Sequence, residues 1–231
     1  MKVISMATPT HRQLEEEWFL ASFKDECRPQ VLHVDDKGPG GGYWRTEGFD
    51  AAVRRKIQYI ADTVAAHRGE LIMWADVDIQ FFQPVVPILE TLMQGKDMLF
   101  QRGNHRHEEV CSGLFVCRAS WKTLIFWRTA QLLMRYYSYK GDQAVTNMLL
   151  GMLKKRPRTR RAFNLFGIHW DYLPDSFYCP GVNYSMLWNP GDALPIPDPI
   201  HLHHANFTKG VSNKLAQFAY VRDIVAARKG S

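Results

Sequence analysis

The sequence Leu-Ile-Met-Trp-Ala-Asp-Val-Asp at residues 71–78 decides the fold. Five consecutive apolar residues bounded by charge are typical of a short strand buried on both faces, as in a parallel sheet. Asp76 and Asp78 follow directly, so their carboxylates should emerge at the C-terminal edge of the sheet, where open α/β sheets bind ligands. Side chains two apart on a strand point to opposite faces. Both carboxylates therefore reach one ion only if the chain turns at Val77.

Strands and helices alternate through the first hundred residues, which predicts βαβ units and a Rossmann-like sheet. Strands are expected at 2–7, 30–34, 71–75, 98–101 and 113–117. Helices are expected at 10–23, 49–66, 84–93, 120–137, from 141 toward 154, and at 214–228. The glycine-rich segment 35–48 and the polar segment 102–109 are predicted loops, and 174–199 is expected to hold only short irregular pieces. The absence of GxGxxG and GxxxxGK motifs argues against ordinary dinucleotide and P-loop sites.

The bulk composition predicts a single domain over residues 1–231, because 231 residues with 46% hydrophobic content can bury one main core. Every apolar stretch is interrupted by charge before about 18 residues, so no membrane span is expected. Residues 1–7 are too short for a signal peptide, which predicts a cytoplasmic protein or a soluble domain lacking its targeting segment. The four cysteines show no CxxC spacing, which indicates free thiols.

The net charge of +6 is concentrated at residues 154–161, where six of eight residues are cationic. Such a run is usually a solvated loop or helix end, and otherwise a contact for an anionic sugar, lipid headgroup or nucleic acid. No RNA-binding or zinc-finger signature accompanies it, so no nucleic-acid partner is expected. Peripheral membrane contact through this run is the remaining alternative.

A second polar cluster lies at residues 201–210, His-Leu-His-His-Ala-Asn-Phe-Thr-Lys-Gly. Imidazole is a good ligand for Mn²⁺, and carboxylates such as Asp76 and Asp78 suit Mg²⁺ or Mn²⁺. Lys209 and Lys214 are placed to neutralise phosphate charge that one metal leaves uncompensated. The two clusters together predict a site for a divalent cation and a phosphate.

With these motifs the chain resembles the nucleotide-diphospho-sugar transferase family, whose members are glycosyltransferases of the GT-A fold. The pattern is close to that of family 77 and more distantly similar to that of family 8. The resemblance covers residues 53–214 as ordered landmarks. These are Asp76-Val77-Asp78 with Pro84, Cys111-Ser112-Gly113-Leu114-Phe115, Gly141-Asp142-Gln143, and His204-Ala205-Asn206 with Gly210 and Lys214. It implies an α/β fold, a GT-A (Rossmann-like) mixed sheet flanked by helices. Residues 1–110 would form the nucleotide-sugar half and 111–231 the acceptor half with the metal and phosphate motif.

The resemblance also implies roles for single residues. Mn²⁺, or Mg²⁺, would be held by Asp76, Asp78 and His204; a family-8-like register would instead choose His203 with Lys209. Among His201, His203 and His204 the metal ligand stays open. Contacts to the nucleotide-sugar donor are implied for Lys56, Asp76, Ser112, Gly113, Asn206, Lys209, Gly210 and Lys214.

Asp142 and Gln143 are the implied catalytic residues, near the transferred sugar. Cys111 stands where the family usually has asparagine, which leaves Ser112 as the candidate donor contact. Arg55 is the alternative to Lys56 as the basic residue on the preceding helix. Residues 170–172, Trp-Asp-Tyr, are a candidate acceptor pocket, because an aromatic face stacks on a sugar ring.

The resulting prediction is a metal-dependent hexosyl- or pentosyltransferase of polysaccharide biosynthesis. It would move a sugar from a UDP or GDP donor to a hydroxyl of a glycan or glycoconjugate acceptor. Family resemblance implies retention at the anomeric carbon, whereas inversion would need a base such as Asp142. The alternatives are a DxD-type phosphohydrolase of the haloacid dehalogenase type, and a non-catalytic basic module that binds polyanions through residues 154–161.

Overall fold

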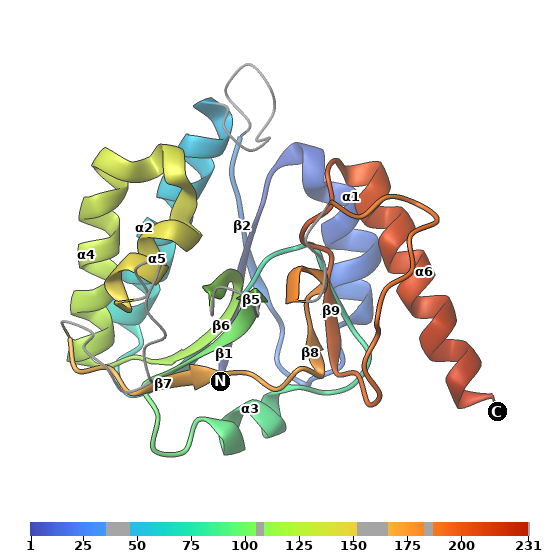
Figure 1. The fold of residues 1–231 in the computed structure, drawn as a ribbon. Helices are drawn as coiled ribbons and strands as arrows, with labels where there is room; N and C mark the ends of the chain where they lie inside the picture. Colours follow the sequence, from blue (N-terminus) through green and yellow to red (C-terminus); the bar gives the residue numbers. More distant parts are fainter. Residues whose placement is uncertain (36–46, 105–108, 152–165, 183–186, 231) are drawn as a thin grey trace.

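The computed structural model of the protein describes residues 1–35, 47–104, 109–151, 166–182 and 187–230. Its main sheet has six strands in the order β2-β1-β3-β6-β5-β7 (Figure 1). Their bounds are β1 Lys2–Ala7, β2 Gln30–His33, β3 Leu71–Ala75, β5 Met98–Asn104, β6 Glu109–Arg118 and β7 Trp170–Tyr172. All five predicted strands are present, and the central one is β3.

The sheet is mixed, as the family resemblance implies. Strand β1 pairs in parallel with β2 and β3, and β5 pairs in parallel with β7. Strand β6 runs antiparallel to both β3 and β5. The expectation that β3 lies in a parallel sheet is therefore right on its β1 side and wrong on its β6 side. Both edges of β3 are paired, and residues 72–75 are buried because both faces of the sheet are covered there.

Three helices cover one face of the sheet: α2 Glu47–Ala66, α4 Trp121–Tyr137 and α5 Gly141–Leu149 (Figure 1). Ile72 and Trp74 of β3 pack into the core beneath them, whereas Met73 and Ala75 pack into the core of the opposite face. This alternation is the two-residue period of a strand. The predicted helical stripe of α2 is buried there, with Ile57 and Ile60 at 1% and 0% exposure. The apolar run at 71–75 thus fills two cores at once.

The opposite face is covered by shorter pieces. The predicted helix at 10–23 begins as a 3-10 turn, η1 Pro9–His11, continues as α1 Arg12–Leu14 and ends as a π-helical segment, η2 Glu15–Leu20. Helix α3 spans Val86–Leu92. Phe19 and Leu89 from these segments are fully buried in the second core. Helical structure was predicted correctly here, but its irregular hydrogen bonding was not.

A second sheet of three strands, in the order β4-β9-β8, was not predicted. It consists of β4 Ile79–Phe81, β9 Leu202–His204 and β8 Phe177–Tyr178, followed by the 3-10 turn η4 Pro180–Val182. Helix α6, Val211–Lys229, lies alongside it and buries Val221 and Val225 in a further core (Figure 1). The strands are too short to carry a periodic signal. Their pairing sets the histidine cluster beside the chain that leaves the Asp-Val-Asp turn.

Strands β5 and β6 are longer than predicted and occupy residues 102–104 and 109 of the segment expected to be a polar loop; residues 105–108 lie outside the described part. Ser120 caps α4 as predicted, because its side chain accepts a hydrogen bond from the backbone N–H of Thr123. The 3-10 turn η3 Ser138–Lys140 then leads into α5. The basic run 154–161 and most of the glycine-rich segment, 36–46, lie outside the described residues.

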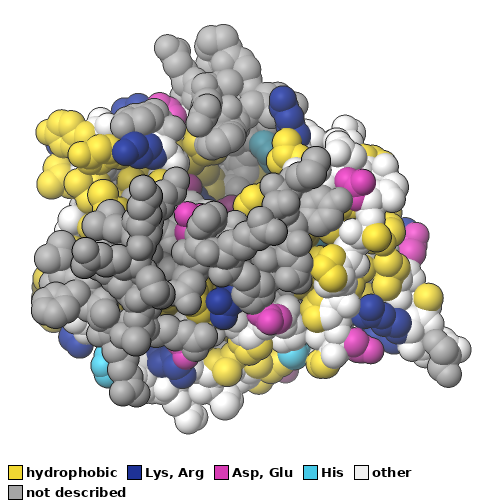
Figure 2. Space-filling model, viewed as in Figure 1, with side chains coloured by type: hydrophobic (Ala, Val, Ile, Leu, Met, Phe, Trp, Pro, Cys, Tyr) yellow, Lys and Arg dark blue, Asp and Glu magenta, His cyan; other side chains and the backbone are white. Residues whose placement is uncertain are grey.

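The visible surface carries charges of both signs, and hydrophobic side chains gather over the end of α4 (Figure 2). The most exposed hydrophobic side chains of α4 are Trp121, its first residue, and Tyr136, near its last, at 72% and 71%. Within the described ranges, no helix is both long enough and apolar enough to cross a membrane.

Candidate active site

The Asp-Val-Asp segment forms the turn that a shared ligand requires. Strand β3 ends at Ala75, residues 77–78 form a turn, and β4 begins at Ile79. The backbone N–H of Asp76 donates to the carbonyl of Gly113 at 2.8 Å, and the carbonyl of Asp78 accepts from the N–H of Ala205 at 2.9 Å. Because the chain leaves the strand between the two aspartates, both carboxylates are free to face the same point.

His204 is brought to the two aspartates by strand pairing. In the second sheet, His204 of β9 lies opposite Ile79 of β4, the residue after Asp78. Its Nε2 lies 3.3 Å from Oδ1 of Asp78. Ligand atoms of Asp76, Asp78 and His204 all lie within 4.8 Å of one another. Residues 126 positions apart in the sequence thus form one compact group at the junction of the two sheets.

His203 points elsewhere. Its ring stacks on Tyr178 at 5.8 Å between centroids and meets Phe218 edge-on at 5.6 Å. Burial among these rings lowers the pKa of His203 to about 3, with the charge of His204 acting in the same direction. His201 stacks on Phe177 at 5.3 Å. Of the three histidines, the structure sets only His204 beside the aspartates.

The two candidate lysines also differ. The ammonium group of Lys214, on α6, contacts Oδ2 of Asp78 and donates to the carbonyl of Ala205 at 2.9 Å. Lys209 is exposed. Gly210 has a φ of 85°, in the left-handed region that favours glycine, and precedes the first turn of α6. This turn of the chain directs Lys214 back toward the aspartates.

Lys56 bridges two carboxylates that belong to different elements. Its Nζ lies 3.0 Å from Oδ1 of Asp76 and 2.9 Å from Oδ2 of Asp142, and its side chain is only 7% exposed. Burial by itself lowers the pKa of Lys56, but Asp142 and Asp76 outweigh burial and raise it. Arg55, the alternative basic residue, is exposed and pairs with Gln58. Lys56 is therefore a permanent cation inside the site.

The carboxylates have divergent pKa values. Burial raises the pKa of Asp142, but Lys56 and a hydrogen bond from Ser112 outweigh it, so that the net pKa is lowered. Burial likewise opposes ionisation of Asp78, but Lys214 and His204 hold its pKa well below the usual range. At Asp76, burial and the charge of Asp78 together exceed the effect of Lys56 and raise the pKa. Repulsion between Asp76 and Asp78 is what a bound cation would relieve.

Ser112 and Gly113 lie inside strand β6, which begins at Glu109, four residues before the predicted start at Gly113. A Cβ on Gly113 would stand 2.3 Å from Cε1 of His204 and 2.8 Å from Oδ2 of Asp76. These distances are shorter than side chains tolerate, so only glycine fits between the two candidate metal ligands. The backbone of β6 thus forms the floor of the site.

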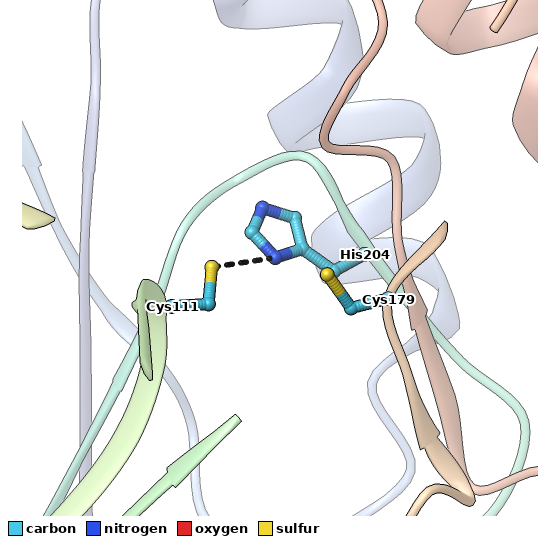
Figure 3. A group of neighbouring side chains, drawn as sticks. All are labelled: Cys111, Cys179 and His204. Atoms are coloured by element: carbon cyan, nitrogen blue, oxygen red, sulfur yellow. Dashed lines mark hydrogen bonds between the residues drawn. The ribbon is translucent and has the colours of Figure 1, made fainter. Parts of the chain in front are cut away.

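A second group of potential ligands shares His204. Sγ of Cys111, on β6, lies 3.7 Å from Nδ1 of His204, and Sγ of Cys179, which follows β8, lies within 4.8 Å of that sulfur and of a ring nitrogen of His204 (Figure 3). All four cysteines are free thiols, as predicted. The side-chain amide of Asn206 donates to Sγ of Cys179 at 2.6 Å. Asn206, expected at the donor, is therefore engaged with sulfur in this structure.

Of the remaining predicted residues, Gln143 lies next to Asp142 on α5, and residues 170–172 lie on the edge strand of the main sheet. Gln143 is half-buried in the first turn of α5, and its backbone N–H supports the carboxylate of Asp142. Residues 170–172 form β7 at the edge of the sheet, where the ring of Trp170 packs on Phe100 and Tyr172. The guanidinium of Arg102 lies 4.0 Å from the centre of the Tyr172 ring.

Two residues that contact the site were missed from the sequence, Gln101 and Trp74. Oε1 of Gln101 lies 2.7 Å from Nδ1 of His204. The indole N–H of Trp74 donates to Oδ1 of Asp76 at 2.7 Å. A polar residue at 101, after the apolar Met-Leu-Phe at 98–100, was the available signal for Gln101. Trp74 gave none, because its place in an apolar run predicts only burial.

The donor set suits a hard divalent cation. Two carboxylates and one imidazole are ligands that Mn²⁺ accepts, and Mg²⁺ prefers the oxygens among them. Burial lowers the pKa of His204, but Asp78 and Cys111 outweigh burial and raise it to about 10. Around the two aspartates, Lys56, Lys214 and the imidazolium therefore supply the positive charge. A divalent cation displacing the imidazolium proton would add one net positive charge to this group.

Comparison with known proteins identifies the family of the chain. A family model described as nucleotide-diphospho-sugar transferase matches residues 3–218. No curated protein sequence matches the chain. Several solved structures do, and the three described below have 8–11% sequence identity to it.

The glycosyltransferase GlyE of Streptococcus pneumoniae TIGR4 has a TM-score of 0.54 and 10% identity, covering 99% of this chain and 63% of that one. The galactosyltransferase LgtC, in complex with donor and acceptor sugar analogues, has a TM-score of 0.54 and 11% identity, and the match covers 92% of this chain and 88% of that one. A glycosyltransferase involved in glycosylation of the major capsid of PBCV-1 has a TM-score of 0.57 and 8% identity, and the match covers 94% of this chain and 100% of that one. The chain thus spans less than two thirds of the GlyE structure, and at these low identities the TM-scores show likeness of fold alone. Because the family model spans nearly the whole chain, the protein belongs to the nucleotide-diphospho-sugar transferase family, and its fold is that of the GT-A glycosyltransferase structures it matches.

Proposed function

We propose that the protein transfers a hexose or pentose from a UDP or GDP donor to a hydroxyl of a glycan or glycoconjugate, with Mn²⁺ or Mg²⁺ held by Asp76, Asp78 and His204. The observation that carries the proposal is the convergence of these three side chains within 4.8 Å, from β3, the turn before β4, and β9. When bound, the cation supplies Lewis-acid stabilisation of the charge that develops on the leaving diphosphate.

Two lysines are the candidate partners of the diphosphate and the donor sugar. Lys214 contacts Asp78 and is placed to move its ammonium to a phosphate oxygen when a cation takes over that carboxylate. Lys56 stays between Asp76 and Asp142, too buried to leave. We assign to Lys214 the neutralisation of phosphate charge, and to Lys56 the orientation of the two carboxylates.

Asp142 is a weak candidate for a general base. Its lowered pKa and its ion pair with Lys56 disfavour proton uptake from an acceptor hydroxyl. With Ser112 donating to it and Gln143 beside it, Asp142 is better suited to accept hydrogen bonds from hydroxyls of the transferred sugar. This supports retention of the anomeric configuration over an inverting mechanism that uses Asp142.

The acceptor is assigned to a cavity of about 150 Å³ beside the site. Its lining includes Arg102, Asp175, Tyr178 and Cys179 together with Pro195 and Pro197. Cys179 also belongs to the group around His204, which joins this cavity to the candidate metal ligands. A pocket that mixes a ring, a guanidinium and a carboxylate suits a sugar, which offers an apolar face and several hydroxyls.

Family membership argues against both alternatives, the phosphohydrolase and the polyanion-binding module. The deciding experiment is a thermal-shift screen of UDP, GDP and their sugars, with and without Mn²⁺. We expect a nucleotide diphosphate to raise the Tm only with the metal, and Asp78→Asn to remove that rise. Asp223→Asn, an exposed carboxylate paired with its neighbour Arg222, is the matched control and should leave it intact. Nucleotide binding that needs no metal and survives Asp78→Asn would overturn the proposal.

A further inference from the structure

The two ring nitrogens of His204 have different surroundings. Nε2 faces Oδ1 of Asp78 at 3.3 Å, on the side of the two aspartates. Nδ1 faces Oε1 of Gln101 at 2.7 Å, on the opposite side. A metal ion binds only a nitrogen that carries a free lone pair, so the position of the ring proton decides which side of His204 is a ligand.

The orientation of the Gln101 amide is determined by its other contacts. Its Nε2 donates to the carbonyls of Phe177 and Tyr178, at 3.0 and 3.1 Å. Both N–H bonds are thereby used, and the oxygen is the atom left facing His204. An amide oxygen only accepts hydrogen bonds. The proton of this hydrogen bond therefore belongs to Nδ1 of His204.

The sulfur of Cys111 leads to the same assignment. It accepts from the backbone N–H of Gly113 at 3.4 Å and from the side-chain amide of Asn206 at 3.8 Å. The same sulfur lies 3.7 Å from Nδ1 of His204 (Figure 3), the ring nitrogen that Gln101 also contacts. A sulfur already surrounded by donors is suited to accept from Nδ1 as well.

An irregularity of the main sheet creates this arrangement. Phe100 of β5 lies opposite Phe115 of β6, but the next residue, Gln101, lies opposite Cys111. Such bulges redirect side chains and occur next to active sites. Gln101 is 1% exposed, so water does not compete for its amide.

We propose that Gln101 is a positioning residue: it holds the proton of His204 on Nδ1, so that the lone pair of Nε2 is presented to the cation between Asp76 and Asp78. The inference rests on the proposed function for the identity of the cation, and on the structure alone for the position of the proton. Outer partners of this kind typically change metal affinity about 10–100-fold when they are replaced.

Two measurements test the proposal. The first is the Mn²⁺ dissociation constant, obtained by electron paramagnetic resonance, for the wild type, Gln101→Met and Gln217→Met. Gln217 is the matched control, a buried glutamine on α6 that donates to Thr208. We expect Gln101→Met to weaken Mn²⁺ binding about 10-fold or more, and Gln217→Met to leave it unchanged. Equal affinities of the two variants would overturn the proposal.

The second measurement needs no substitution, so a variant that fails to fold does not stop the test. Proton–nitrogen NMR of protein labelled with ¹⁵N-histidine locates the ring proton directly, without metal and with diamagnetic Mg²⁺. We expect a slowly exchanging proton on Nδ1 of His204 in both states. A bare Nδ1 in the wild type would overturn the role of Gln101. Failure of the wild type to bind Mn²⁺ would instead contradict the proposed function, and the proton position in the metal-free protein would still decide the inference.

Discussion

Nζ of Lys56 lies 2.9 Å from Oδ2 of Asp142, and this contact joins α2 to the first turn of α5 across the candidate site. The same ammonium group lies 3.0 Å from Asp76 at the end of β3. One buried cation thus holds together three elements that are up to 86 residues apart in the sequence. The ion pairs of Lys56 therefore connect elements of the fold as well as shaping the candidate site.

Replacement of Lys56 by methionine should destabilise the protein strongly. Methionine keeps the length of the side chain but leaves Asp76 and Asp142 buried without their shared cation. Removing one partner of a buried ion pair costs roughly 3–5 kcal/mol, and we expect a loss in that range in urea denaturation. The double variant with Asp142→Asn should recover part of it. A loss of unfolding free energy below about 1 kcal/mol would show that the ion pairs of Lys56 contribute no more than exposed ion pairs do.

The stability of the metal-free protein should fall steeply in acid. The folded-state pKa values of Asp78 and Asp142 are lowered from 3.8 by neighbouring cations, which outweigh burial. A lowered folded pKa means that the stabilisation is present above the unfolded pKa and is lost as pH falls through the folded pKa. The free energy of unfolding should therefore drop below pH 3.8, with a shallower slope in Asp142→Asn. Identical slopes would contradict the assignment of this dependence to Asp142.

Neighbouring histidines should respond in opposite ways. His204→Gln should abolish Mn²⁺ binding, because Nε2 beside Asp78 is lost. His203→Gln should retain binding, because that ring lies among Tyr178 and Phe218. Calorimetric titration with Mn²⁺ compares the two directly. The reverse result would support the alternative register with His203 and Lys209.

Gly113→Ala should weaken Mn²⁺ binding without a comparable loss of folding. The added Cβ would stand 2.3 Å from the imidazole of His204, so this side chain must shift. We expect a loss of about 10-fold or more in Mn²⁺ affinity, as for other changes that misplace a ligand. Gly230→Ala is the control, since its Cβ would meet its nearest neighbour only at 3.9 Å. Unchanged affinity in Gly113→Ala would mean that His204 adapts freely.

Local patterns were sufficient to predict the main elements of the fold. The apolar run at 71–75 predicted the central strand, the stripe containing Ile57 and Ile60 predicted α2, and Ser120 predicted the start of α4. Each of these signals extends over several neighbouring residues and needs no distant partner. The turn at Val77 was also foreseeable, because two carboxylates on one strand would otherwise diverge.

The second sheet and the choice among the histidines depended on tertiary contacts. Strands β4, β8 and β9 have two or three residues each, too few to show a period. Their pairing turns His203 into a core of rings and His204 toward Asp78. Adjacent residues on a strand face opposite ways, so the register alone decides which of the two lies at the site.

The sequence by itself determined the chemical composition of the site: two carboxylates after a buried strand, a late imidazole, and lysines that follow them. Only the tertiary structure decided which of these groups meet and which nitrogen of His204 faces the aspartates. Residue type and local period are properties of neighbouring positions. The contact of Gln101 with His204 instead follows from a bulge in one sheet and the strand order of another.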